Sequence, residues 1–319
     1  MNAAERLAGI HHVTAIAGDP QQNVDFYAGT LGLRLVKQTV NFDDPGTYHL
    51  YFGDAAGHPG TILTFFPWPG APKGRHGAGQ ATVVSFSVPP DSIGFWEERL
   101  RGRGITFEAL QSPFDESVLE FSDPHGLQLE LVADPRKELG QPWAGAPVPV
   151  SYAIRGFHSV ALLERSYEGT EGLLTKVMGF RLAHSVGHRR RYAAAEGGLA
   201  AHVDVVGAPD ASPGHVAVGT VHHVAWRAAT DEAQRAWRQR LVEAGVNVTP
   251  VRDRQYFRSI YYHEPGGVLF EIATDPPGFG VDEPPEALGS RLRLPAWLEP
   301  RREALEAQLP PLHPPPPQR

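Results

Sequence analysis

Two stretches far apart in the chain open in the same way: Gly9-Ile-His-His-Val-Thr-Ala-Ile16 and Thr220-Val-His-His-Val-Ala-Trp226. The same opening recurs, more weakly, in Gly156-Phe-His-Ser-Val-Ala-Leu-Leu163 and in Ala81-Thr-Val-Val-Ser-Phe-Ser-Val88. Each stretch is a short, largely apolar run, which is typical of a buried strand. Four such strands along one chain indicate an internal repeat, and this repeat decides the fold.

The repeated units also close alike, in Asp123-Pro-His-Gly-Leu-Gln-Leu-Glu130 and in Glu264-Pro-Gly-Gly-Val-Leu-Phe-Glu271. Both are a turn that enters an apolar strand carrying one glutamate. Between the opening and closing strands, apolar residues recur at three- and four-residue steps, as in a helix, and short β-rich segments follow. The sequence therefore predicts a β-α-β-β-β unit that occurs four times, near residues 8–68, 79–135, 153–207 and 218–276.

This pattern predicts an α+β fold in which four βαβββ modules form two half-barrel domains, each curled around a cleft. We expect modules 1 and 2 to form an N-terminal domain over residues 1–139 and modules 3 and 4 to form a C-terminal domain over 153–276. The segment 140–152 between them is rich in Pro and Gly and is predicted to be a linker. Residues 277–319 are predicted to be a Pro-rich arm, with one short helix over 295–309 that packs back on the body.

The composition narrows the class of protein. With 41% hydrophobic and 20% charged residues, the chain can bury a core. A net charge of -7 without a basic stripe argues against a nucleic-acid partner. The absence of an apolar run near the ~18 residues of a membrane span, and of a secretory signal, predicts a cytoplasmic protein without a membrane partner. Because the chain has no Cys but 15 His, any transition-metal site must use imidazole and carboxylate.

The opening strands offer two sets of candidate histidines, because successive side chains of a strand face opposite ways. If the first position faces the cleft, the candidates are His11, His158 and His222. If the second position faces it, they are His12 and His223, and modules 1 and 4 must then share a cleft.

The closing strands supply the acid of the candidate site. Glu271 and Glu130 each stand among apolar residues, where an ionised carboxylate is costly unless it is paired or bound to a metal. Two imidazoles and one carboxylate on one face leave coordination positions open, as in non-haem iron(II) oxygenases. Since Val83 and Ser159 replace the second-position histidines of modules 2 and 3, Glu130 is expected to be exposed or hydrogen-bonded in a duplicated site without a metal.

The openings, together with Gly267-Val-Leu-Phe-Glu-Ile-Ala-Thr-Asp275, resemble the vicinal oxygen chelate superfamily of glyoxalases and extradiol dioxygenases. Within it, nearly the whole chain resembles the ring-cleaving dioxygenases that open hydroquinones. The stretches that carry this resemblance are Gly32-Leu-Arg-Leu-Val-Lys-Gln-Thr-Val-Asn-Phe-Asp-Asp44, Tyr48-His-Leu-Tyr-Phe-Gly-Asp54, Pro59-Gly-Thr-Ile-Leu-Thr-Phe-Phe-Pro67 and Leu294-Pro-Ala-Trp-Leu-Glu-Pro300.

The resemblance implies a metal held by His12, His223 and Glu271, with iron(II) as the metal and manganese(II) also suited to these ligands. It implies a small aromatic substrate and O2, and it places further catalytic residues around the metal. These residues are Tyr261, Arg254, His222, Thr14 and His11. Strand parity leaves Tyr262 as a rival of Tyr261, and Arg252 and Arg258 as rivals of Arg254.

The function expected from these features is an extradiol-type ring-cleaving dioxygenase that incorporates both atoms of O2. One alternative is a metal-dependent isomerase or lyase of the glyoxalase type, although Thr64 stands where the first module's acid would be. Another is a non-enzymatic protein that binds a small aromatic in the same cleft. The Pro-rich arm and the pairable strands also favour a homo-oligomer.

Overall fold

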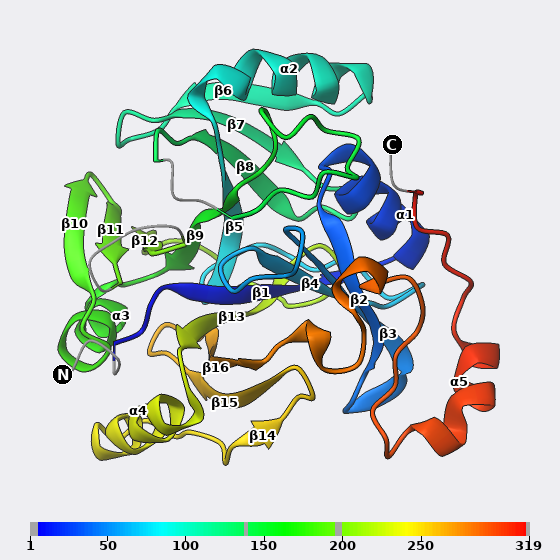
Figure 1. The fold of residues 1–319 in the computed structure, drawn as a ribbon. Coiled ribbons are helices and arrows are strands. Elements are labelled where there is room, and N and C mark those ends of the chain that lie inside the picture. Colours follow the sequence, from blue (N-terminus) through cyan, green and yellow to red (C-terminus); the bar gives the residue numbers. More distant parts are fainter. Residues whose placement is uncertain (1–5, 137–139, 195–199, 317–319) are drawn as a thin grey trace.

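The computed structural model describes residues 6–136, 140–194 and 200–316. All four predicted units are present, and each consists of one strand, a helical segment and three further strands. Figure 1 shows the units as successive colours along the chain. The predicted α+β class is therefore confirmed.

The elements of each unit follow the same order. Unit 1 consists of β1 (Ile10–Ala17), α1 (Pro20–Val24), η2 (Asp25–Thr30), β2 (Arg34–Asn41), β3 (Asp44–Gly53) and β4 (Ile62–Pro67). Unit 2 consists of β5 (Gln80–Val88), η3 (Pro90–Ser92), α2 (Ile93–Gly102), β6 (Phe107–Gln111), β7 (Ser117–Ser122) and β8 (Gln128–Ala133). Unit 3 consists of β9 (Gly156–Glu164), α3 (Glu168–Gly172), η4 (Leu173–Val177), β10 (Arg181–Val186), β11 (Arg189–Ala193) and β12 (His202–Gly207). Unit 4 consists of β13 (Val221–Ala228), α4 (Asp231–Glu243), β14 (Arg252–Asp253), β15 (Phe257–His263) and β16 (Leu269–Pro277).

The strands form two eight-stranded sheets. Sheet 1 has the order β14-β15-β16-β13-β1-β4-β3-β2 and joins units 1 and 4 through the antiparallel pair β1–β13. Sheet 2 has the order β10-β11-β12-β9-β5-β8-β7-β6 and joins units 2 and 3 through the antiparallel pair β5–β9. The opening strands thus pair across the segment 140–152, and units 1 and 4 share a sheet, as the second-position set of histidines requires. Whether 1–139 and 153–276 fold as separate domains stays a prediction.

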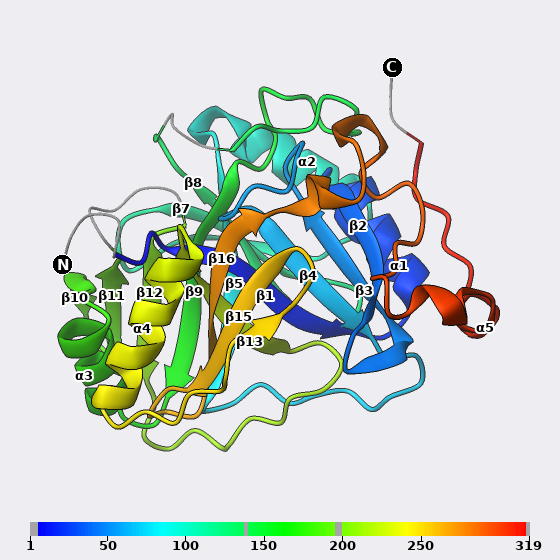
Figure 2. The same ribbon diagram turned by 60° about the horizontal axis from the view of Figure 1, so that its bottom comes forward.

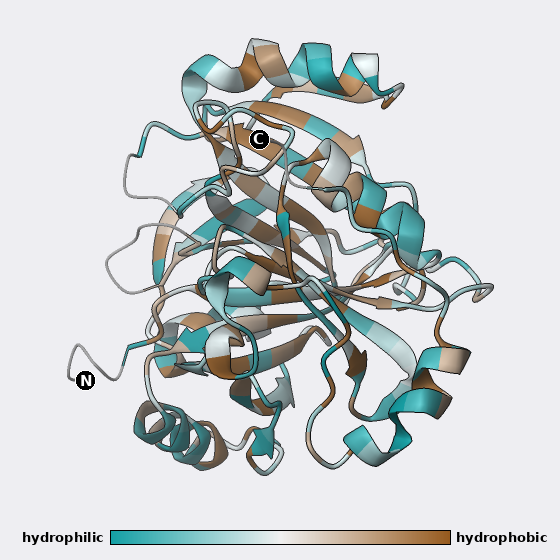
Figure 3. Ribbon diagram, turned by 45° about the vertical axis from the view of Figure 1, so that its right-hand side comes forward, coloured by the Kyte–Doolittle hydropathy of each residue, from teal (hydrophilic) through white to brown (hydrophobic). Residues whose placement is uncertain are grey.

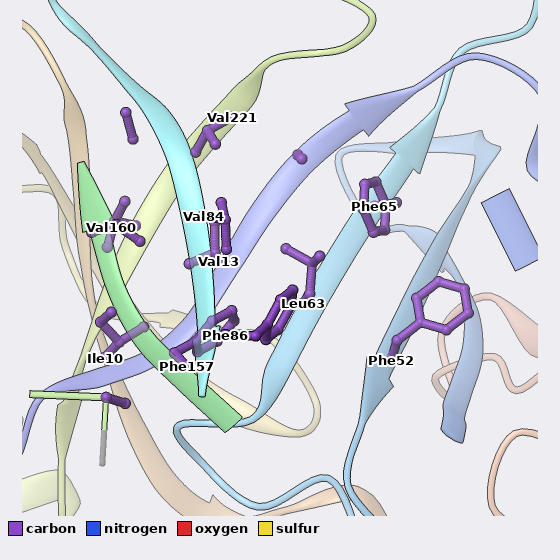
Figure 4. Packing of buried hydrophobic residues seen from close by; sticks show 14 of the residues in the cluster. Ile10, Val13, Phe52, Leu63, Phe65, Val84, Phe86, Phe157, Val160 and Val221 are labelled. Atoms are coloured by element: carbon purple, nitrogen blue, oxygen red, sulfur yellow. The ribbon is translucent and has the colours of Figure 1, made fainter. Parts of the chain in front are cut away.

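Apolar side chains of the two central strand pairs fill the space between the sheets. Figure 4 shows Ile10 and Val13 of β1 beside Val84 of β5 and Val160 of β9. Figure 3 shows the matching distribution of hydropathy, with brown stretches along the strands and teal on the outer faces of the helices. The sheets are therefore held together by a shared core, and the polar site must lie elsewhere in each sheet.

The helices cover the outer faces of the sheets (Figures 1 and 2). Helix α4 begins where Thr230 accepts a hydrogen bond from the Ala233 backbone N–H, and it ends before Gly245, whose φ is +81°. Its buried side chains Trp237 and Leu241 lie one helical turn apart, which directs one face toward the sheet. No helix within the described ranges is long and apolar enough to cross a bilayer.

The C-terminal segment runs beside β2 and β3 (Figures 1 and 2) and contains η5 (Phe279–Val281), η6 (Pro285–Ala287), η7 (Glu299–Arg301) and α5 (Arg302–Gln308). The Lys37 ammonium of β2 is fully buried and pairs with Asp282 at 2.6 Å and with Glu283. Leu305 of α5 is also fully buried. The predicted arm thus packs on the body, although its α-helix starts later than 295 because Pro300 cannot donate a helical hydrogen bond.

Candidate metal centre

The three predicted ligands converge on one point of sheet 1. His12 Nε2 lies 3.3 Å from His223 Nε2 and 3.4 Å from Glu271 Oε2, and His223 Nε2 lies 2.9 Å from the same oxygen. All three side chains are buried. Antiparallel pairing of β1 with β13 brings the histidines together, and parallel pairing of β13 with β16 adds the glutamate.

Glu271 carries an acceptor that the protein leaves unused. Oε1 accepts a hydrogen bond from Ser259 Oγ at 2.5 Å, whereas the buried Oε2 has no hydrogen bond of acceptable geometry. Burial favours the protonated acid, but His12 and His223 outweigh burial and hold the pKa of Glu271 well below its ordinary value. An ionised buried carboxylate with a free oxygen, facing two imidazole nitrogens, has the donor set of a divalent metal site.

Two of the first-position histidines, His11 and His222, lie beside the Nδ1 atoms of the His12 and His223 rings. His11 Nδ1 lies 2.9 Å from His12 Nδ1, and His222 Nδ1 lies 2.8 Å from His223 Nδ1. Such a contact fixes the rings of His12 and His223 so that each Nε2 faces Glu271. Burial, followed by the charge of His223, lowers the pKa of His222 to about 3, so its imidazole is neutral. His158, the remaining first-position residue, lies in sheet 2, where its Nε2 is 3.1 Å from Glu116 Oε1.

A cavity of about 340 Å³ opens above the ligands. Tyr261 and Arg254 both line it, and Arg254 Nε donates to the Tyr261 hydroxyl at 3.1 Å. Burial, followed by the charge of Glu271, raises the pKa of Tyr261, so this phenol stays protonated. His222 also lines the cavity, whereas Thr14 and His11 are buried behind it.

The rival residues are separated by strand parity. Tyr262 points into the core, where its hydroxyl lies 3.5 Å from Met178 Sδ. Arg258 pairs with Asp231 on the outer face at 2.5 Å and does not line the cavity. Arg252 does line it, with its side chain half-exposed, so it accompanies Arg254.

His49 also lines the cavity, and sequence reasoning missed it. Its Nε2 lies 2.8 Å from Thr64 Oγ1, which in turn lies 2.9 Å from Thr14 Oγ1, and the Tyr51 hydroxyl lies 2.9 Å from its Nδ1. Burial, followed by the charges of the two histidine ligands, lowers the pKa of His49 well below its ordinary value. The alternation of His49 and Tyr51 with apolar neighbours along β3 was a signal that they share a face.

Among the described residues, sheet 2 brings together no comparable group of ligands. Glu130 accepts a hydrogen bond from Ser85 Oγ at 2.5 Å, in agreement with the expectation that this acid is exposed or hydrogen-bonded. Arg191 pairs with Asp204 at 2.7 Å and with Glu116 at 2.6 Å. Across the residues that the structure describes, three or more histidine or acidic ligands come together at His12, His223 and Glu271 alone.

A protein-family model matches the chain in two segments, one over units 1 and 2 and one over units 3 and 4. The model of the Glyoxalase/Bleomycin resistance protein/Dioxygenase superfamily matches residues 9–131 and 156–279. The chain belongs to this superfamily. The two matched segments include all three candidate ligands and leave out most of the C-terminal segment, which is an addition to the shared fold.

Individual relatives cover almost the entire chain. "Putative ring-cleaving dioxygenase MhqO" of Bacillus subtilis (strain 168) is 49% identical over 306 residues, which cover 96% of this chain and 97% of the relative. The chlorohydroquinone/hydroquinone 1,2-dioxygenase of Sphingobium indicum is 37% identical over 308 residues, with 94% and 95% covered. A crystal structure from Bacillus subtilis superposes with a TM-score of 0.92 at 48% identity, covering 97% of this chain and 98% of that one. These likenesses support a ring-cleaving dioxygenase, and thus an oxidoreductase that uses an aromatic substrate and O2.

Proposed function

We propose that this protein is an iron(II)-dependent, extradiol-type dioxygenase that opens the ring of a hydroquinone or a related dihydroxylated aromatic. The observation that carries the proposal is the free, buried Oε2 of Glu271, which faces His12 Nε2 and His223 Nε2. Bound there, iron(II) would supply open coordination positions and the electron transfer that lets O2 react with an aromatic ring. Manganese(II) suits the same ligands.

The side chains around the ligands are suited to a phenolic substrate. Arg254 lies in the cavity as a permanent cation and can stabilise negative charge on a substrate oxygen. The protonated Tyr261 hydroxyl next to it can donate a hydrogen bond to that oxygen or pass on a proton. The neutral imidazole of His222 lies on the cavity wall, where it can accept a hydrogen bond from a substrate hydroxyl group.

A glyoxalase-type isomerase is less well supported by this site. Thr64 is fully buried and interacts with Thr14 and His49, so unit 1 contributes no carboxylate at this position. The described ligand group thus holds one acid, Glu271. A site with one acid and two histidines keeps more positions free for substrate and O2 than a four-ligand site does.

Oxygen uptake tests the proposal. The protein is loaded anaerobically with iron(II) or manganese(II), the bound metal is quantified, and hydroquinones and catechols are added in an oxygen electrode. We expect one O2 to be consumed per ring-opened product with at least one hydroquinone, and we expect no uptake by His223→Ala, which should also fail to retain metal. Metal binding without oxygen uptake for any substrate would contradict the proposal.

A further inference from the structure

The cavity ends in a rim that is built from both sides of sheet 1. The turn between β2 and β3 places Asn41, Phe42 and Asp43 on one side. From the other side, Arg254 donates to Asp43 Oδ2 at 2.9 Å, and Arg252 lies 3.7 Å from Oδ1. The side chains of Asp43 and Arg252 are 59% and 49% exposed, which marks the rim as the solvent end of the cavity.

Phe42 is the apolar member of this rim, and the C-terminal segment supports it from outside. Its ring meets that of Trp297 edge to face, with centroids 5.6 Å apart and an interplanar angle of 75°. Trp297 is 54% exposed, whereas Leu294 and Leu298 on either side of it are buried. The leucines anchor the backbone, and the indole between them lies against the cavity rim instead of the core.

Backbone and side-chain contacts fix this segment along β2, the strand that leads to Phe42. Gln38 Nε2 donates to the Gly289 carbonyl at 2.6 Å, and the Arg293 backbone N–H donates to the Gln38 carbonyl at 2.8 Å. Arg293 also pairs with Glu283 at 3.1 Å, which in turn pairs with Lys37. Trp297 is therefore held in a defined position relative to Phe42.

The residues that line the cavity indicate which part of a substrate would contact Phe42. The cavity lining includes the apolar side chains Phe42, Phe66, Trp68 and Leu269. Its volume of about 340 Å³ is near the lower end for small-molecule sites. A ring whose hydroxyl oxygens lie at the metal position would direct its other substituents toward this apolar wall and its rim.

We propose that Phe42, braced by Trp297, is a specificity-determining residue that limits the size of the ring substituents accepted by the cavity. The inference rests on the proposed function, because it assumes that the substrate's hydroxyl oxygens face the metal. Shortening Phe42 lengthens the apolar end of the cavity. Removing the indole of Trp297 lets the Phe42 ring move outward, with a similar result. Neither change touches a metal ligand.

Anaerobic calorimetry with the full-length, iron(II)-loaded protein tests the proposal. The dissociation constants of hydroquinone and of tert-butylhydroquinone are measured, and their ratio is compared between variants. We expect Phe42→Ala and Trp297→Ala to shift the ratio in favour of tert-butylhydroquinone by at least about tenfold, the lower end of the effect of one methylene group in an apolar pocket. Trp297→Phe should shift it less, because a ring edge remains.

Val281→Ala is the matched control, since Val281 is 50% exposed on the same segment and does not line the cavity. It should leave the ratio unchanged. If the ratio of dissociation constants in both alanine variants stayed within about twofold of the wild-type ratio, the proposed size limit would be overturned. Binding of hydroquinone would in that case still support the proposed function. Failure of the wild type to bind hydroquinone would overturn both. If Phe42→Ala does not fold, Phe42→Leu replaces it, with an intermediate shift expected.

Discussion

The hydrogen bond from Ser259 to Glu271 allows metal binding to be separated from folding. Ser259 Oγ donates to Glu271 Oε1 at 2.5 Å, and both side chains are fully buried. A hydrogen bond to a charged group is worth about 1.5–3 kcal/mol. In Ser259→Ala we expect metal affinity to fall about 10- to 100-fold, because the lost donor also keeps Oε2 directed at the two histidines.

Ser85→Ala is the matched control for this change. Ser85 is fully buried, and its Oγ donates to Glu130 Oε2 at 2.5 Å in sheet 2. The chemistry lost is therefore the same as in Ser259→Ala, but Glu130 has no pair of histidine ligands beside it. We expect Ser85→Ala to lower the free energy of unfolding by about 1–3 kcal/mol and to leave metal affinity unchanged.

Two measurements decide between the roles of the serines. Anaerobic titration of iron(II) against a chelating indicator gives the metal affinity of each variant. Urea unfolding of the metal-free protein gives the free energy of unfolding. If Ser259→Ala bound iron(II) as tightly as Ser85→Ala does, the hydrogen bond would serve folding alone, and the reasoning about Glu271 would be refuted.

Three further variants probe the site and its surroundings. Tyr261→Phe should lower kcat for hydroquinone by at least about tenfold with unchanged metal content, since it removes a proton donor from the cavity; steady-state oxygen uptake with metal analysis checks this. Burial, followed by the charge of Glu264, raises the pKa of Glu164 to about 8, so the folded protein retains a proton that the unfolded chain loses above its ordinary pKa of 4.5. Stability should therefore fall as pH rises from 4.5 toward 8, by at most about 1.4 kcal/mol per pH unit, and Glu164→Gln should reduce this slope in thermal melts. Lys37→Met should lower the free energy of unfolding by about 1–3 kcal/mol in urea, because Glu283 loses its ammonium partner and keeps its ion pair with Arg293.

Much of the candidate metal centre could be predicted from the sequence, because the candidate ligands occupy repeated strand positions. Alternation along a strand reduced the histidines to two sets, and resemblance to known dioxygenases favoured His12 and His223. Two members of the first-position set, His11 and His222, also belong to the site. They lie against the Nδ1 atoms of the His12 and His223 rings. Two adjacent histidines were informative because one can bind a metal while the other supports its ring from behind.

The residues that sequence reasoning missed depend on contacts between distant strands. His49 reaches the cavity because β3 pairs with β4, which pairs with β1. Phe42 and Trp297 are 255 positions apart in the sequence (297 − 42). Their rings come together because the C-terminal segment runs along β2. Local patterns predict which face of a strand is buried, but they do not say which strand lies next to it.

The buried acids of the two sheets differ in the partners that the protein gives them. In sheet 2, Arg191 lies between Asp204 and Glu116, so these carboxylates are neutralised within the protein. In sheet 1, Glu271 has no such cation at hydrogen-bonding distance among the described residues, and its Oε2 remains free beside two imidazoles. Burial of a carboxylate is costly unless a positive charge lies beside it, and the proposed metal would provide that charge at Glu271. In the proposed function, a bound metal would supply to Glu271 the positive charge that Arg191 supplies to Asp204 and Glu116.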